Sequence, residues 1–136
     1  MQKVEDFMYG LFLARIAEEK HILASRAPYR QKYFATDCQW DSRVGTLEMI
    51  ETEAIVGVEE SDLEVTVITA YKIPFIVTGV QTHRRRYHLK AVAERWLIQR
   101  VEKECPACRG QGDENCLYCK GRHWLGTGPA ATNNKA

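Results

Sequence analysis

The sequence lacks a long hydrophobic run, and it lacks an excess of charge of either sign. The longest apolar run near the N-terminus covers residues 8–14 and is interrupted by Gly10, whereas a membrane-spanning helix needs about 20 apolar residues. Nineteen Lys and Arg against eighteen Asp and Glu give a formal net charge of +1. The sequence therefore argues against a membrane span, and its overall charge gives no reason to expect binding to nucleic acid or an anionic membrane.

The N-terminal stretch also lacks the long apolar region and small-residue cleavage site of a secretory signal. We therefore expect a cytoplasmic protein that binds no membrane. Of its residues, 45% are hydrophobic and 27% are charged. This composition is typical of a single globular domain with its own core.

Hydrophobic periodicity predicts helices first and strands afterwards. Val4, Phe7, Met8 and Leu11 recur at helical spacing, which predicts a helix over 4–25. Pro28 suits the first position of a helix, so a second, short helix is predicted over 28–34. Alternating and β-branched residues then predict strands over 48–58, 63–73, 79–92 and 96–103, with turns at 59–62 and 93–95. The predicted class is α+β with an antiparallel sheet.

Four of the five cysteines form two C-x-x-C pairs near the C-terminus: Cys105, Cys108, Cys116 and Cys119. In a chain without an export signal this spacing predicts a tetrahedral zinc site rather than disulfides. Four thiolates leave no open position on the metal, so the zinc would be structural. The alternative is a set of free or redox-active thiols.

The residues around the four cysteines fit this prediction. Gly110 and Gly121 follow the second cysteine of each pair, where a left-handed turn suits glycine, and Arg109 and Lys120 can offset the negative charge of the thiolates. His123 could replace one cysteine, although four sulfurs suffice. The remaining cysteine, Cys38, is expected to be buried.

Charge is segregated along the predicted strands. Residues 44–71 contain acidic side chains and no Lys or Arg, whereas residues 81–100 are strongly basic and include Arg84, Arg85 and Arg86. We expect opposite charges to pair across neighbouring strands. The alternative is a nucleic-acid-binding patch at these arginines, but no aromatic residues are interleaved with them, as they are at many single-strand-binding sites.

Strand alternation places Arg84, Arg86 and His88 on one face, and Arg85 with Tyr87 on the other. An inward Arg85 could bind an anionic ligand, or it could pair with a buried carboxylate such as Glu53 or Asp37. The candidates for a ligand pocket are Tyr9, Tyr33, Asp37, Arg85 and His88. No spacing joins them into a catalytic motif, which leaves enzymatic activity uncertain and favours structural roles.

Two segments carry a resemblance to a known fold family. Residues 29–40 look like a second helix running into a first strand, and residues 86–102 look like a closing hairpin. With the element order, they resemble the nuclear transport factor two-like fold. The resemblance implies a cone-shaped sheet wrapped against helices, a pocket at its wide end and homodimers through the sheet. The family's catalytic residues cannot be matched to this chain.

Residues 105–112, Cys-Pro-Ala-Cys-Arg-Gly-Gln-Gly, are similar to the C-x-x-C-x-G-x-G repeat of the DnaJ-type chaperone zinc domain. In the second copy, His123 stands where the repeat has glycine. Only two such knuckles are present, enough for one zinc ion, and chaperone activity is not implied.

These interpretations predict a cone-shaped domain over 1–103, a zinc knuckle over 104–125 and a flexible tail over 126–136. The predicted function is a non-catalytic binding or assembly module. The alternatives are a small-molecule lyase or isomerase that uses the pocket, and a nucleic-acid-binding protein. The apolar residues of the knuckle must pack either on the sheet or on a partner: Leu117, Tyr118, Trp124 and Leu125.

Overall fold

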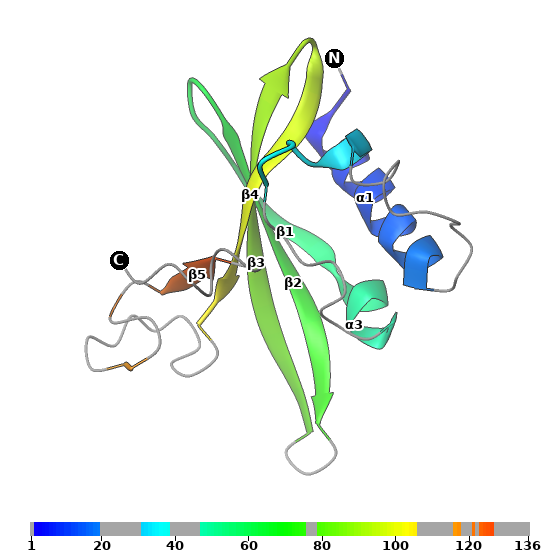
Figure 1. Cartoon of the computed structure of the whole chain (residues 1–136). Helices are drawn as coiled ribbons and strands as arrows, with labels where there is room; N and C mark the ends of the chain where they lie inside the picture. Colours follow the sequence, from blue (N-terminus) through cyan, green and yellow to red (C-terminus); the bar gives the residue numbers. More distant parts are fainter. Residues whose placement is uncertain are drawn as a thin grey trace.

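The computed structural model describes residues 2–19, 31–38, 47–75, 79–105, 116, 117, 121 and 123–126. The helices named among the described residues precede the strands, and this segregation of helices from strands is typical of an α+β fold (Figure 1). The elements are α1 (Val4–Glu19), α3 (Leu47–Thr52), β1 (Ala54–Glu60), β2 (Val65–Phe75), β3 (Gly79–Val92), β4 (Arg95–Glu104) and β5 (Trp124–Gly126). None of the helices among the described residues is long and apolar enough to span a lipid bilayer.

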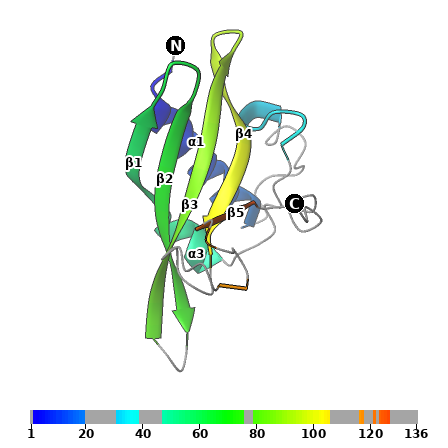
Figure 2. The same ribbon diagram turned by 90° about the vertical axis from the view of Figure 1, so that its left-hand side faces the viewer.

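The strands form one antiparallel sheet in the order β1-β2-β3-β4-β5, so each strand pairs with its neighbour in sequence. Figure 2 shows α1 behind this sheet, and Figure 1 shows α1 and α3 on the same side of it. The sheet therefore has an inner face, which the helices cover, and an outer face, which they do not.

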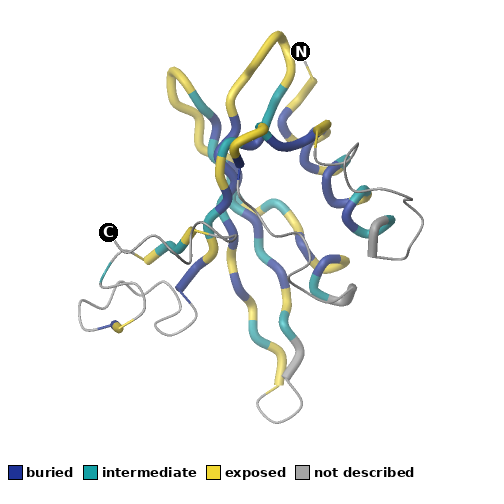
Figure 3. The backbone as a smooth tube through the Cα atoms, in the orientation of Figure 1, coloured by how far each residue is buried: buried dark blue, intermediate teal, exposed yellow. Residues whose placement is uncertain are grey.

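The core lies between α1 and the inner face. The apolar stripe of α1 is buried, and it packs with inward residues of β2, β3 and β4 (Figure 3). Gly10 allows residues 31–38 to approach α1, because a Cβ there would lie 2.7 Å from the Tyr33 hydroxyl. The Tyr33 ring packs on Phe7 with centroids 5.3 Å apart. A glycine within a helix is tolerated here because it makes room for this contact.

The helical predictions are partly confirmed. Helix α1 starts at Val4 as predicted and ends at Glu19; residues 20–25 lie outside the described residues. Residues 31–33 are helical, whereas residues 28–30 lie outside the described part. The strand expected after this helix is absent from residues 34–38, where Phe34 forms only an isolated bridge with Ile98.

The strand prediction over 48–58 is wrong in its first half. Residues 47–52 form α3, and β1 begins only at Ala54. The Thr52 hydroxyl donates to the Met49 carbonyl, as helical spacing allows. The physical reason is that Leu, Glu and Met at 47–49 favour a helix, whereas the β-branched pair that favours a strand begins at Ile55.

The predicted β3–β4 hairpin is confirmed. Its two-residue turn consists of Ala93 and Glu94, whose φ angles are 52° and 63°. Such left-handed turns match the twist of the flanking strands, although Asn-Gly is the usual sequence. The hairpin fixes β4 beside β3, with Arg86 opposite Glu102.

Candidate functional site

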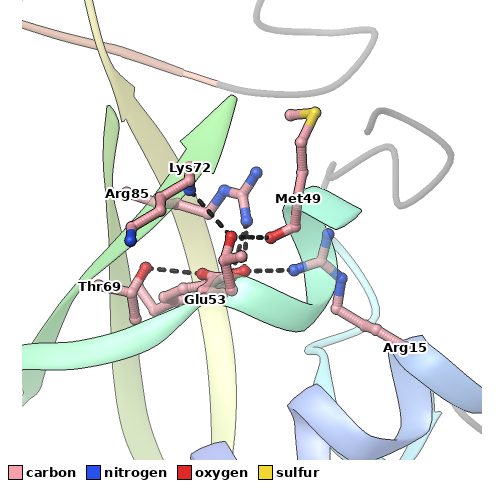
Figure 4. Close-up of polar contacts among 8 residues, drawn as sticks. Arg15, Met49, Glu53, Thr69, Lys72 and Arg85 are labelled. Carbon is pink, nitrogen blue, oxygen red and sulfur yellow. Dashed lines mark hydrogen bonds and ion pairs between the residues drawn. The ribbon is translucent and has the colours of Figure 1, made fainter. Parts of the chain in front are cut away.

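A buried polar cluster lies between the helices and the inner face, centred on Glu53 (Figure 4). Arg15 of α1 and Arg85 of β3 each donate to Glu53 Oε1, at 2.6 and 2.8 Å. The hydroxyls of Thr69 and Tyr87 donate to Oε2, both at 2.6 Å. The Glu53 side chain is 1% exposed, and its donors come from α1, β2 and β3.

Local structure brings Glu53 to this place. It is the single residue between the end of α3 and the start of β1. The Lys72 amide donates to the Thr52 hydroxyl at 2.9 Å, which ties the end of α3 to β2 (Figure 4). The carboxylate therefore points under the sheet from a junction that is itself fixed by hydrogen bonds.

The electrostatics of the cluster stabilise the ion pair. Burial alone would raise the pKa of Glu53, but Arg85, Arg15 and the two hydroxyl donors together lower it below its usual value. Burial also raises the pKa of the Tyr87 phenol. Because the carboxylate stays ionised and the phenol stays protonated, neither group is poised for proton transfer near neutral pH.

Arg85 thus takes the carboxylate-pairing role that was one of its two predicted alternatives. Its guanidinium also lies 4.5 Å from the centroid of the Tyr71 ring, and the Tyr71 and His83 rings are 6.2 Å apart. The cluster consequently continues along β2 and β3 through the Tyr71 and His83 rings.

The other predicted pocket residues do not gather around Arg85. Tyr9 is 65% exposed on α1, and Tyr33 is buried in the core. Asp37 is exposed in a turn, and His88 lies on the outer face with Arg86. The five predicted residues therefore do not line one site.

Sequence reasoning missed Arg15 and Thr69 as members of the cluster. Arg15 lies four residues beyond Leu11 on the buried stripe of α1, a spacing that could have identified it. Thr69 lies on the same strand face as Val67 and Tyr71, all buried. A polar residue on an apolar face indicates a buried hydrogen-bonding partner.

The outer face carries a ladder of ion pairs between β3 and β4. Arg84 pairs with Glu104 and Arg86 with Glu102, each at 2.8 Å. The prediction that these arginines pair with residues 44–71 is therefore wrong for Arg84 and Arg86. The reason is register, which sets Glu102 directly opposite Arg86.

His88 extends the ladder. Its Nε2 lies 2.5 Å from Glu102 Oε1, and its Nδ1 lies 3.4 Å from Glu64 Oε1 and 3.3 Å from the Thr66 hydroxyl. Burial tends to raise the pKa of Glu102, but hydrogen bonds from His88 and Arg86 lower it to about 2. Glu102 is therefore ionised at neutral pH, and its role is to hold the ladder together.

The described part of the cysteine segment brings Cys105 and Cys116 together. Both are buried, and their sulfurs are 3.6 Å apart. Among the described residues, no group of three or more His, Cys, Asp or Glu could hold a metal ion. Cys108 and Cys119 lie outside the described residues, as do Gly110, Arg109 and Lys120.

Two further residues of this segment have left-handed backbone conformations. Gly121 has φ 87°, which confirms the predicted left-handed turn there. His123 has φ 72°, so it adopts the conformation typical of glycine at the position where the repeat has glycine. Its carbonyl accepts a hydrogen bond from the Cys105 amide at 2.8 Å.

Comparison with known proteins yields one similar structure. No protein-family model matches the chain, and no curated protein matches it significantly. The structure is similar to the crystal structure of an NTF-2-like protein of unknown function from Shewanella oneidensis MR-1. The match has a TM-score of 0.40 and 10% sequence identity, and it covers 69% of this chain and 93% of that chain.

Proposed function

We propose that this protein is a non-catalytic binding or assembly module that forms a homodimer through the outer face of its sheet and holds one structural zinc ion. The observation that carries the non-catalytic part is the closure of the buried cluster around Glu53. Its carboxylate already accepts four hydrogen bonds from side chains. This buried polar cluster therefore holds α1, β2 and β3 together.

The distribution of charge on the outer face supports a second copy of the chain as the partner. Register places Glu59, Thr66, His88 and Arg100 in one row across β1 to β4. Glu59 and Arg100, at opposite ends of this row, are both exposed. A two-fold axis near the middle of the row would set Glu59 of each copy against Arg100 of the other, as an isologous interface requires.

Sedimentation equilibrium tests the dimer. We expect a dimer for the wild-type protein, a weaker dimer for Arg100→Glu, and recovery in the double variant Glu59→Arg/Arg100→Glu. Lys3→Glu, an exposed change beside α1, serves as the matched control and should leave the dimer intact. A monomer at all concentrations, or a dimer that none of these changes affects, would contradict the proposal.

The zinc ion is supported by the spacing of Cys105 and Cys116. Two sulfurs bound to one tetrahedral zinc at about 2.3 Å lie about 3.8 Å apart, and these sulfurs are 3.6 Å apart although they belong to different C-x-x-C pairs. Cys105, Cys108, Cys116 and Cys119 would hold the ion, which would supply folding free energy to a segment with little core of its own. Reduced thiolates are also expected of a cytoplasmic protein.

Elemental analysis of protein purified without chelator tests the zinc site. We expect about one zinc per chain, retained in His123→Gly and lost in Cys116→Ser. Cys38→Ala, which changes a cysteine outside the two pairs, is the control. Loss of zinc in His123→Gly would show that the imidazole is a ligand, and wild-type protein without zinc would refute the site.

A further inference from the structure

Strand β5 has few pairing contacts of its own. It has three residues, and they pair with Glu102, Lys103 and Glu104 of β4. Three residues are at the short end of the usual range for strands, and β5 lies at the end of the strand order, beside β4 alone. Contacts outside the ladder with β4 therefore contribute to holding β5 in place.

The cysteine segment supplies such contacts immediately before β5 and within it. Immediately before β5, the His123 carbonyl accepts the Cys105 amide, so the chain leaving β4 is tied to the chain entering β5. Within β5, the Leu125 side chain packs on the buried pair Cys105 and Cys116. Two of the contacts that hold β5 are thus made to the cysteines themselves.

Once held, β5 places Trp124 on the outer face. The Trp124 ring lies 4.5 Å from the Arg86 guanidinium carbon and 5.8 Å from that of Arg84. Both arginines belong to the outer ladder, and Trp124 is directly opposite Glu104 in the register. The half-buried indole therefore extends the surface proposed for the second copy, and tryptophan is a frequent anchor of such interfaces.

We infer that the metal site acts as a latch on β5. With zinc bound, β5 stays on β4 and Trp124 contributes to the dimer interface. Without zinc, β5 is released and the dimer weakens. This inference rests on the proposed zinc site and dimer. Dimer formation would then depend on the metal, although no residue of the metal site lies in the Glu59–Arg100 row. Release would also expose the β4 edge, which is a template for pairing with other chains.

Hydrogen exchange read by mass spectrometry tests the latch separately from the dimer. Chelation of zinc from the wild-type protein should remove amide protection from residues 124–126 and from the β4 amides that face β5, and it should leave the β2–β3 and β3–β4 pairings protected. Restoring zinc should restore the protection. Unchanged protection of residues 124–126 after complete removal of zinc would overturn the latch, as would a native protein that binds no zinc.

Sedimentation of Trp124→Ala tests the interface. With zinc retained, this variant should dimerise at least about tenfold more weakly, and chelated wild-type protein should show a similar loss. Leu117→Ala, a change at a 91% exposed side chain of the same segment, should affect neither zinc nor dimer. If zinc-loaded Trp124→Ala dimerises as tightly as the wild-type protein, Trp124 has no role in the interface. If the wild-type protein is a monomer, the proposed dimer is refuted, and the hydrogen-exchange experiment alone decides whether zinc holds β5 on β4.

Discussion

Three consecutive arginines of β3 enter two different environments, one on each face of the sheet. Arg85 is 5% exposed and bonded to Glu53 beneath the helices. Its neighbours Arg84 and Arg86 lie on the outer face, with 48% and 28% of their side chains exposed, and they pair with carboxylates of β4. Strand alternation alone gives one residue type these two roles.

The comparison shows how burial changes the worth of an ion pair. Removing one member of a buried pair leaves a charge without compensation in a poorly solvated place, at a cost of about 3–5 kcal/mol. Exposed pairs contribute only about 0.2–1 kcal/mol, because water and salt screen them. The inner cluster should therefore contribute more to stability than the outer ladder does.

The largest effect is expected at the centre of the inner cluster. Glu53→Gln keeps the shape of the side chain but removes the charge between Arg15 and Arg85. We expect a loss of about 3–5 kcal/mol in the free energy of unfolding, measured by urea denaturation. Glu51→Gln, an exposed change on α3, should cost less than about 0.5 kcal/mol. If Glu53→Gln and Glu51→Gln lower the free energy of unfolding by similarly small amounts, the buried cluster contributes no more to stability than an exposed side chain does.

Acid should weaken both faces in the same direction. The pKa values of Glu53 and Glu102 are lowered in the folded protein from the ordinary 4.5, that of Glu102 to about 2. The stability they contribute is therefore fully present above about pH 4.5, and it is lost progressively as pH falls from there towards the lower pKa of each folded-state carboxyl, about 2 for Glu102. The urea concentration at the midpoint of unfolding, measured from pH 7 to pH 3, should decline below pH 4.5. The decline should be less steep for Glu102→Gln than for the wild-type protein. A midpoint that rises on acidification would contradict these shifts.

The smallest effect is expected on the outer ladder. Arg84→Ala and Arg86→Ala should each cost about 0.2–1 kcal/mol, less at high salt. Because both arginines are already paired with carboxylates, the double variant should leave any affinity for RNA or single-stranded DNA unchanged. Tight, salt-sensitive RNA binding that the double variant abolishes would establish the nucleic-acid alternative instead.

The sequence was most informative where a short-range period decides the structure. Alternation correctly separated Arg85 and Tyr87 from Arg84, Arg86 and His88, and the β3–β4 turn was predicted from its residues. The helical stripe of α1 was also predicted. These features depend on the positions of neighbouring side chains, which the sequence states directly.

Long-range partners could not be chosen in the same way. Glu53 and Asp37 were equally good candidates to pair with Arg85, and only the position of α3 brings Glu53 beneath the sheet. The pairing of Arg86 with Glu102 depends on the register of β3 and β4, which includes a shift between His88 and Leu89. A shift of one residue changes which side chains share a face, so these pairs follow from tertiary structure.

Native mass spectrometry of protein purified without chelator tests the zinc site and the dimer together. One spectrum reports the number of chains and of metal ions in the same particle. We predict two chains with two zinc ions, and a larger fraction of metal-free monomers after chelation. A zinc-free monomer as the native species would refute both the zinc site and the dimer.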